Sequence, residues 1–591
     1  MLYLKLSKIP LLITFILITH GSSAKQSVTI NNIQGHTDAS AMIGKKVQLE
    51  GIVTANFQED KKFAGFFIQS ENTKPKQRGS SGIFVFEKDK KVTVGELVRI
   101  KGTVSEHKGG TQISKVTSIR ALKHDQPLPK AVAIKLPLKN YKLENLEGML
   151  VTLDSPAYVT DHYNYIKYGE FTVSSKLLMN PTNNASPGPK ASLLKKQNYN
   201  DRLLIDDGSY NLFPQYQEIN TKSPIQFGAK VQVVGVLHYA FDSYRLELTQ
   251  PIKFKNSPYA TGNRPKNIPG HVKIASFNLK NYFTTIDDGK IMCGPNKNFG
   301  CRGADSNKEF VRQQTKLVNA INSANADVFA LQELENNEDS IKTLVNELNK
   351  DANSKKWKYI KTGTLGEDVI KVGLIYQRNK VTPVGQHKIL NPKAMPDFEA
   401  DKNRDVLLQS FKDSKDNVFR IAVVHLKSKR CTDAVGADLD QKDGQGCYNI
   451  SRVKVAQQIS KWLSQKTISE KVTATIIAGD FNAYSKEQPL SIFAKNSFTN
   501  LNDKFLGAEN WTSIFRGKVG SIDHIIVNPS ALKAAKGMTQ WHINSTVSGW
   551  FDYNLEDLAK SKPKPRNFYD TSPFASSDHD IIIAGFDFSQ K

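Results

Sequence analysis

Beyond its first 24 residues, the sequence lacks any apolar run long enough to cross a membrane. A transmembrane helix needs roughly 20 consecutive, mostly apolar residues, so we expect no membrane-spanning segment in the rest of the chain. The composition, with 39% hydrophobic and 23% charged residues, is ordinary for globular proteins. That balance excludes a disordered chain as the default interpretation.

Cysteine is scarce, with four residues in 591, and no pair has the C-x2-C spacing typical of zinc sites. Zinc binding is therefore the disfavoured alternative. Cys293 and Cys301 are eight positions apart, and Cys431 and Cys447 are sixteen apart. Three connectivities are formally possible, but pairing of near neighbours is favoured because each bond closes a short loop. In an exported protein, this pattern predicts two local disulfides.

Acidic residues are too few to balance the basic ones: 57 Asp and Glu face 81 Lys and Arg, for a net charge of +24. One interpretation is solubility alone. The sharper one is a polyanionic partner, such as nucleic acid or an anionic membrane surface.

The first 24 residues have the pattern of an export signal. Lys5 and Lys8 form a positive region, "IPLLITFILIT" (9–19) is a short apolar core, and "SSA" (22–24) offers small residues for cleavage. We therefore expect cleavage after Ala24 and a secreted or periplasmic protein.

The remaining chain is too long for one core and divides by texture into two β-rich regions, a linker and a larger domain. Short alternating strands over 25–130 predict a small barrel or sandwich. A second β-rich domain over 131–256 contains a polar excursion, 178–209, which has loop composition. The Pro- and Gly-containing segment 257–270 is the expected linker, and 271–591 is the expected catalytic domain.

From residue 271 onward, strands that are apolar almost throughout alternate with helical stretches, two of which are expected at 306–325 and 449–465. Such strands are buried on both faces, which predicts an α/β sandwich of stacked sheets with helices outside.

Each of these strands ends in polar residues. Taken alone, any one of them is better explained as a turn residue or a satisfied core polar group. Six such sites in one domain are much less easily explained by chance. They are Asn278, Glu333, His425, Asp480 with Asn482, Asp523, and Asp578 with His579.

In this order, the motifs "FN", "QE", "VVH", "GDFN", "SIDH" and "SDH" resemble the endonuclease/exonuclease/phosphatase superfamily, which includes deoxyribonuclease I, exonuclease III and bacterial sphingomyelinases. The whole chain further resembles secreted bacterial extracellular endonucleases of that superfamily, through "CGPNKNFGCRGADS" (293–306) and "DGQGC" (443–447). The resemblance implies a four-layer α/β sandwich, as in deoxyribonuclease I, behind an N-terminal OB-fold-like module. A generic small barrel is the alternative for that module.

The resemblance also implies roles for the strand-end residues. Glu333 would be the principal ligand of Mg²⁺ or Mn²⁺, with Asn278 and Asp578 completing or flanking the site; hard oxygen ligands suit such ions. Asp480 and Asn482 would orient the attacking water and hold a phosphate oxygen. His579 would be the general base with Asp523 fixing its tautomer, and His425 the second acid or phosphate donor.

Basic residues near these motifs are candidate phosphate ligands: Arg404, Lys427 and Lys429. For the two lysines, a solvent-exposed surface position without a phosphate contact is an equally favoured interpretation. The resemblance also implies an acidic partner for His425, for which Glu367 and Asp368 are available and Asp368 is favoured. The acids of the loop 436–447 make Ca²⁺ a further candidate, although the loop lacks the D-x-D-x-D-G spacing.

These features predict a secreted, metal-dependent, monomeric nuclease that cuts extracellular DNA internally, with RNA as a further substrate. A phospholipid phosphodiesterase of the same fold is the alternative, because its catalytic residues would be nearly identical. The positive charge and the absence of an apolar aromatic hairpin favour the nuclease. A non-catalytic nucleic-acid-binding matrix protein is a third possibility, disfavoured by the intact catalytic motifs.

Overall fold

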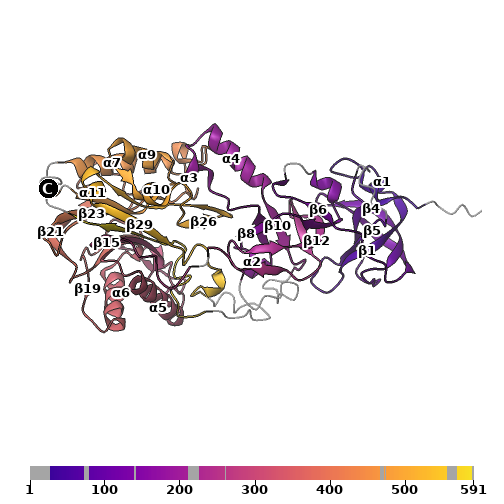
Figure 1. Ribbon diagram of the computed structural model, residues 1–591, viewed down its shortest axis with the longest axis horizontal. Coiled ribbons are helices and arrows are strands. Elements are labelled where there is room, and N and C mark those ends of the chain that lie inside the picture. Colours follow the sequence, from indigo (N-terminus) through magenta and orange to yellow (C-terminus); the bar gives the residue numbers. More distant parts are fainter. Residues whose placement is uncertain are drawn as a thin grey trace, which may run out of the picture.

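The computed structural model describes residues 27–71, 79–138, 142–210, 225–259, 261–465, 472, 474–554 and 569–588. The expected export signal and its cleavage point at Ala24 lie outside this range. The described chain forms an elongated molecule with three parts in a row (Figure 1). A small barrel lies at one end, a nine-stranded sheet in the middle and a large α/β sandwich at the other end.

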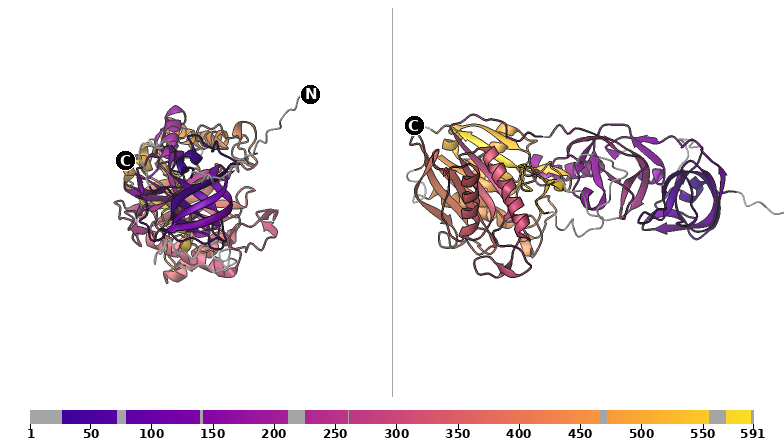
Figure 2. Two further views of the ribbon diagram at one scale, coloured as in Figure 1. Left: turned by 90° about the vertical axis from the view of Figure 1, so that its right-hand side faces the viewer. Right: turned by 90° about the horizontal axis from the view of Figure 1, so that it is seen from below.

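The N-terminal part is a closed barrel with strand order β1-β2-β3-β5-β4. Its strands are Lys46–Phe57, Gly65–Gln69, Gly82–Phe86, Leu97–His107 and Gly110–Lys123 for β1 to β5, and the short helix α1 is Ile30–Gln34. Apolar side chains such as Val53, Ile68 and Ile100 fill the interior. Viewed along the long axis of the molecule, the barrel lies in front of the other two parts (Figure 2, left).

The middle part is a nine-stranded sheet of order β14-β11-β8-β9-β10-β13-β12-β7-β6. These strands are β6 (Val132–Ile134), β7 (Leu150–Leu153), β8 (Ala157–Asp161), β9 (Phe171–Ser174), β10 (Leu203–Asp206), β11 (Lys230–Gln232), β12 (Val234–Ala240), β13 (Ser243–Leu248) and β14 (Lys253–Lys255). The short helix α2 spans Tyr165–Tyr168.

The expectation that 178–209 is a loop is wrong. This segment contains the helices α3 (Pro181–Asn184) and α4 (Pro189–Asn200) and the strand β10. Helix α4 buries one residue, Ala191. It therefore has no apolar stripe at helical spacing, which is the signal by which a helix is recognised in a sequence.

The sandwich contains two six-stranded sheets, one of order β19-β20-β18-β15-β30-β29 and the other of order β21-β22-β23-β24-β28-β25. The first comprises Trp357–Tyr359 (β19), Ile370–Gln377 (β20), Val328–Glu335 (β18), Val272–Tyr282 (β15), Ile581–Phe586 (β30) and Ala535–Trp541 (β29). The second comprises Val381–Leu390 (β21), Val406–Asp413 (β22), Val418–His425 (β23), Ala474–Asp480 (β24), Asp523–Val527 (β28) and Thr499–Asn500 (β25).

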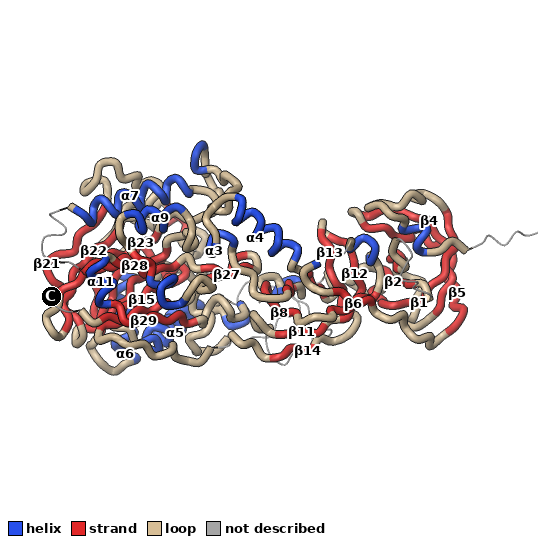
Figure 3. The backbone as a smooth tube through the Cα atoms, turned by 45° about the horizontal axis from the view of Figure 1, so that its top comes forward, coloured by secondary structure: helices blue, strands red, loops and turns tan. Residues whose placement is uncertain are grey.

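Helices cover both outer faces, so the sandwich has four layers (Figure 3). Helices α5 (Asn307–Ala324) and α6 (Glu338–Asp351) pack on the first sheet, and α7 (Asn449–Ser464) and α9 (Gln488–Lys495) pack on the second. Apolar side chains of both sheets, such as Ile274 and Ile476, form the core between them. The expected α/β sandwich is thereby confirmed, as are helices close to 306–325 and 449–465.

Smaller elements complete the domain: the strand pair β16 (Ile291–Cys293) and β17 (Phe299–Gly300), the helices α10 (Leu501–Leu506) and α11 (Pro529–Ala534), and the hairpin β26 (Ser513–Phe515) and β27 (Lys518–Gly520). Disulfides join Cys293 to Cys301 and Cys431 to Cys447, as predicted.

None of the helices in the described part of the chain is long and apolar enough to span a membrane.

Candidate active site

The polar strand ends come together where the edges of the two sheets meet. In the second sheet, His425 pairs with Asp480 across parallel strands β23 and β24, and Asp480 pairs with Asp523 across β24 and β28. In the first sheet, Asn278 of β15 pairs with Gln332 of β18, beside Glu333. Because neighbouring strands lie about 4.8 Å apart, three functional side chains project from one row of the second sheet.

The backbone at two of these positions is unusual. A Cβ atom on Gly479 would lie 1.9 Å from the carbonyl oxygen of Val424, so only glycine allows β24 to approach β23 closely before Asp480. Glu333 has a φ of 61°, a left-handed conformation uncommon for a non-glycine residue. The pairing of β18 with β20 shifts register between Leu331 and Leu334. This irregularity turns Glu333 out of the strand's alternation.

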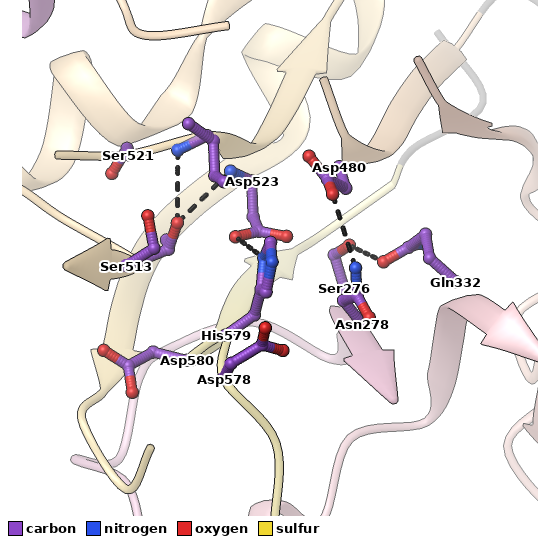
Figure 4. Close-up of polar contacts among 12 residues, drawn as sticks. Ser276, Asn278, Gln332, Asp480, Ser513, Ser521, Asp523, Asp578, His579 and Asp580 are labelled. Atoms are coloured by element: carbon purple, nitrogen blue, oxygen red, sulfur yellow. Dashed lines mark hydrogen bonds and ion pairs between the residues drawn. The ribbon is translucent and has the colours of Figure 1, made fainter. Parts of the chain in front are cut away.

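Asn278 joins the two sheets. Its Nδ2 donates to Glu333 Oε1 at 3.1 Å. The same atom donates to Asp480 Oδ2 at 3.3 Å (Figure 4). Glu333 Oε2 accepts the backbone N–H of Asn281 at 2.9 Å. Asn482 donates its backbone N–H to Asp480 Oδ1 at 2.8 Å and its Nδ2 to Asp480 Oδ2 at 3.2 Å. The amide and carboxylate groups are thus held by one another before any substrate arrives.

Asp480 is 2% exposed, yet its carboxylate stays charged. Burial alone would raise its pKa, but the hydrogen bond from His425 and the charges of His579 and His425 hold the pKa below its ordinary value. His425 Nε2 lies 3.4 Å from Asp480 Oδ2. The other ring nitrogen, Nδ1, is buried and has no hydrogen-bond partner.

A second dyad lies beside it. His579 Nδ1 and Asp523 Oδ2 are 2.8 Å apart, which leaves the Nε2 atom of His579 for other partners (Figure 4). Burial opposes the charged imidazolium, but the carboxylate of Asp523, followed by those of Asp578 and Asp480, raises the pKa of His579 well above its ordinary value. Asp578 itself is exposed and also acts on the Lys280 ammonium, whose pKa is raised by Asp552 and Asp578 against the effect of burial.

The donor set fits a divalent metal ion. Asp480, Asp523 and His579 offer ligand atoms that all lie within 4.8 Å of one another, and Asp523 Oδ1 is buried without a hydrogen-bond partner. Glu333 and Asn278 form a second oxygen-rich group next to them. Carboxylate and amide oxygens are the ligands that Mg²⁺ and Mn²⁺ prefer.

The expected pairing of Asp368 with His425 stays a prediction, and among the described residues no hydrogen bond joins the two side chains. Asp368 Oδ2 instead accepts the Arg404 Nε–H at 2.9 Å, while His425 Nδ1 stays unpaired. Burial would raise the pKa of Asp368, but the charges of Arg404, Arg302 and His425 lower it. The guanidinium of Arg404 is therefore engaged within the protein, with Nε bonded to Asp368 and Nη1 3.4 Å from the carbonyl oxygen of Leu426.

The two lysines differ. Lys427 Nζ lies 4.9 Å from the ring centroid of Tyr448 and is partly exposed. Lys429, expected at a phosphate, is partly exposed but tied to a buried acid: its Nζ lies 2.5 and 2.6 Å from the two carboxylate oxygens of Glu487, which is fully buried. Burial lowers the pKa of Lys429 to about 8. Its charge balances an internal carboxylate, so the predicted phosphate contact is not supported.

The acids of loop 436–447 hold turns. Asp438 accepts the backbone N–H and the hydroxyl of Ser451, and Asp443 accepts the N–H of Gln445. Across the described residues, these acids form no group that converges on one ion. The Ca²⁺ hypothesis for this loop therefore gains no support.

Sequence reasoning missed residues that the middle domain contributes. Thr182 donates its hydroxyl to Glu487 Oε1 at 2.7 Å. Asn183 accepts the Ser521 N–H at 3.0 Å and donates to the carbonyls of Ala508 and Asn510 at 3.1 and 3.3 Å. Both side chains are fully buried. Ser521 lies two residues before Asp523, so a loop from another domain supports the dyad; no local motif signals this.

A model described as "Endonuclease/Exonuclease/phosphatase family" matches residues 276–579, more than half of the chain. Another, "Domain of unknown function (DUF8508)", matches residues 142–257. No curated protein matches.

The sandwich is also similar to solved structures. One is an endonuclease/exonuclease/phosphatase from Bacteroides vulgatus, with 14% identity, a TM-score of 0.34, and coverage of 54% of this chain and 99% of that one. The human Nocturnin catalytic domain with bound sulfate has 13% identity, a TM-score of 0.33, and 56% and 99% coverage. D. rerio TDP2 complexed with single strand DNA product has 16% identity, a TM-score of 0.33, and 54% and 98% coverage.

Proposed function

The chain belongs to the endonuclease/exonuclease/phosphatase family, and from that premise we propose that it is a metal-dependent nuclease that cuts DNA internally, with RNA as a further substrate. One observation carries the proposal. The strand-end residues of two sheets converge, so that an amide links Glu333 to Asp480 beside the Asp523–His579 dyad. The net charge of +24 favours a polymeric phosphate substrate over a phospholipid.

We assign the metal to Glu333 and Asn278, with Asp578 flanking, and we expect Mg²⁺ or Mn²⁺. The group of Asp480, Asp523 and His579 is the second choice, because Asp523 and His579 already contact each other at 2.8 Å. When bound, such an ion neutralises charge on the phosphate and on the leaving oxygen. The protein's own groups do the rest. Asp480 and Asn482 orient the attacking water and a phosphate oxygen. His579 is the general base, because Asp523 holds Nδ1 and leaves Nε2 to accept a proton once the ring is neutral. The surrounding carboxylates raise the pKa of His579, so this neutral form becomes available as the pH rises.

His425 sits on the opposite side of Asp480 from the dyad's strand, and we assign it to the phosphate or the leaving oxygen. Lys427, partly exposed, is the retained phosphate candidate. Arg404 and Asp368 act as a pair that shapes this edge of the site.

We further propose that the N-terminal barrel is an OB-like module that raises affinity for nucleic acid. Support comes from its five strands and their order, since OB folds are five-stranded Greek-key barrels. The proposed division is 25–130 for this module, 131–256 for the middle domain, 257–270 for the linker and 271–591 for the catalytic domain. Two disulfides support export into an oxidising compartment, either extracellular or periplasmic.

The deciding experiment incubates the purified chain with supercoiled plasmid, with Mg²⁺ or with chelator. Nicked circles that form only with the metal are expected, and a Glu333→Gln variant should form them about 10²-fold more slowly. Degradation only from the ends of linear DNA would replace internal cutting by exonuclease action. Failure to cut plasmid, linear DNA and RNA, together with hydrolysis of phospholipid vesicles, would overturn the nuclease proposal.

A further inference from the structure

Four basic side chains and two exposed aromatic rings gather where the middle domain meets the sandwich. We call this set the junction patch: Lys195, Tyr199, Arg202, Phe515, Arg516 and Lys518. The first three belong to helix α4 and the segment after it, and the others to the hairpin β26–β27. In Figures 1 and 3, α4 and this hairpin lie near each other at the seam between the two domains.

The patch is built rather than accidental, because the hairpin tip is seated on the middle domain. Gly517 has a φ of 70° and is buried, and a Cβ there would lie 3.0 Å from Asp161 Cβ and 3.4 Å from Arg202 Nη2. Arg202 Nη2 in turn lies 3.6 Å from Asp161 Oδ2. A side chain on residue 517 would therefore push the hairpin off strand β8.

The charges in the patch are crowded. Burial, and then the charges of Arg202, Arg516 and Lys195, lower the pKa of Lys518 to about 8, against the opposing effect of Asp161. The Nε of Arg202 is buried without a hydrogen-bond partner. Like charges held together cost free energy, and a bound polyanion would relieve that cost.

The aromatic rings add a second kind of contact. Tyr199 is 80% exposed and Phe515 is 59% exposed, so both rings are open to solvent. The Arg516 guanidinium lies 5.4 Å from the centroid of the Phe515 ring. Exposed rings interleaved with cations are the arrangement that stacks unpaired bases while neutralising the backbone between them.

One member of the patch is close along the chain to the candidate active site. Val519, the residue after Lys518, exchanges backbone hydrogen bonds with Leu178 and Asn180 at 2.9 and 2.7 Å. Asp523 follows Lys518 by five residues. At roughly 3.3 Å per residue of extended chain, the backbone of Lys518 lies within about 16 Å of that of Asp523. A strand of a few nucleotides spans that distance.

We propose that the junction patch binds a single strand of nucleic acid and leads it to the active site, so that the middle domain is a substrate-binding domain. The inference rests on the proposed nuclease function and names its substrate form. Base stacking on Tyr199 and Phe515 needs unpaired bases, which duplex DNA does not offer.

The test measures binding separately from cleavage. A fluorescein-labelled 24-nucleotide oligo(dT) is titrated with the full chain in chelator, over a salt series, by anisotropy. Lys195→Ala and Arg516→Ala should each weaken binding about tenfold. Each should also reduce the log–log salt slope by about 0.7, the value for one phosphate contact on a single strand. Phe515→Ala should weaken binding about tenfold with an unchanged slope. Lys358→Ala, an exposed lysine on the distant strand β19, is the matched control and should change neither.

Unchanged affinity and slope in Lys195→Ala and Arg516→Ala would overturn the proposal. So would an equal loss of affinity for a 24-base-pair duplex, because the patch would then be a general cationic surface. A cleavage arm compares the oligonucleotide with bis(p-nitrophenyl) phosphate in Mg²⁺, and the rise in KM for Arg516→Ala should be about tenfold larger for the oligonucleotide. If the wild-type chain cleaves neither substrate, the proposed function fails, while the binding titration still decides the patch.

Discussion

Asn183 lies in the middle domain, yet replacing it with leucine should slow catalysis in the α/β sandwich. Leucine keeps the approximate volume of the side chain but removes the acceptor for the Ser521 N–H. It also removes the donor to the carbonyls of Ala508 and Asn510. Ser521 leads directly into Asp523, which orients His579 through the 2.8 Å contact. The substitution therefore acts on the dyad through the backbone.

The magnitude follows from burial. Ser521 is fully buried and Asn510 is 3% exposed, so neither group can turn to water. An unsatisfied buried donor or acceptor costs about 1–3 kcal/mol, so these two groups together give a loss of about 2–6 kcal/mol in the free energy of unfolding. A displacement of about 1 Å at a catalytic group can cost about 10²-fold in rate. We expect kcat for plasmid nicking to fall by about 10–10²-fold, with little change in KM.

The assay combines urea unfolding with steady-state kinetics under conditions where the variant is folded. The pH–rate profile is recorded as well, since Asp523 raises the pKa of His579 and a looser contact should shift the profile's limb toward lower pH. Asn56→Leu is the control. It removes a 2.7 Å hydrogen bond to the carbonyl of Val92 within the N-terminal barrel, away from the seam. If Asn183→Leu loses stability but keeps the wild-type kcat and pH profile, the middle domain supports the fold only, and the reasoning is refuted.

Three further outcomes are expected. Glu333→Gln keeps an acceptor for the Asn281 N–H but removes the negative charge. Mg²⁺ affinity, measured by calorimetry, and the rate of plasmid nicking should each fall by about 10²-fold, while the melting temperature stays unchanged. If the variant keeps its Mg²⁺ affinity, Glu333 is not a metal ligand. Lys429→Met leaves the carboxylate of Glu487 buried without its cation and should cost about 3–5 kcal/mol of unfolding free energy, whereas unchanged stability with a raised KM would restore the phosphate role. Burial, followed by the charges of Glu144 and Glu106, raises the pKa of Glu147 from 4.5 to about 8. The folded state therefore binds this proton more tightly than the unfolded state does. The contribution of Glu147 to the free energy of unfolding is complete below about pH 4.5 and is lost as the pH rises to about 8, by up to about 1.4 kcal/mol per pH unit. Glu147→Gln should flatten this slope in unfolding experiments between pH 5 and 8, and an unchanged slope would contradict the assignment.

Much of the architecture is written in local patterns. Strands buried on both faces are apolar along their whole length, and this pattern predicts the stacked sheets before any coordinates are known. The polar residues that end those strands, such as Asp480 and Asp523, are visible for the same reason, because they interrupt an apolar run. The cysteine pairs are also local, with separations of 8 and 16 residues. The sequence by itself thus determined the sandwich and the strand-end residues that it brings together.

Which group each polar side chain contacts depends on long-range packing, and the local sequence does not reveal it. The sequence predicts Lys429 as a phosphate ligand, but in the structure its Nζ bonds the carboxylate of Glu487, 58 residues away. The sequence predicts Asp368 as the partner of His425, and the structure adds a hydrogen bond from Arg404 to the carboxylate of Asp368. Asn183 lies 338 residues from Ser521, and nothing in either segment indicates the contact. A side chain's charge and hydrogen bonds depend on which groups packing brings within about 3 Å and on how much water it removes. Those are properties of the folded surface between domains, and no local pattern along the chain encodes them.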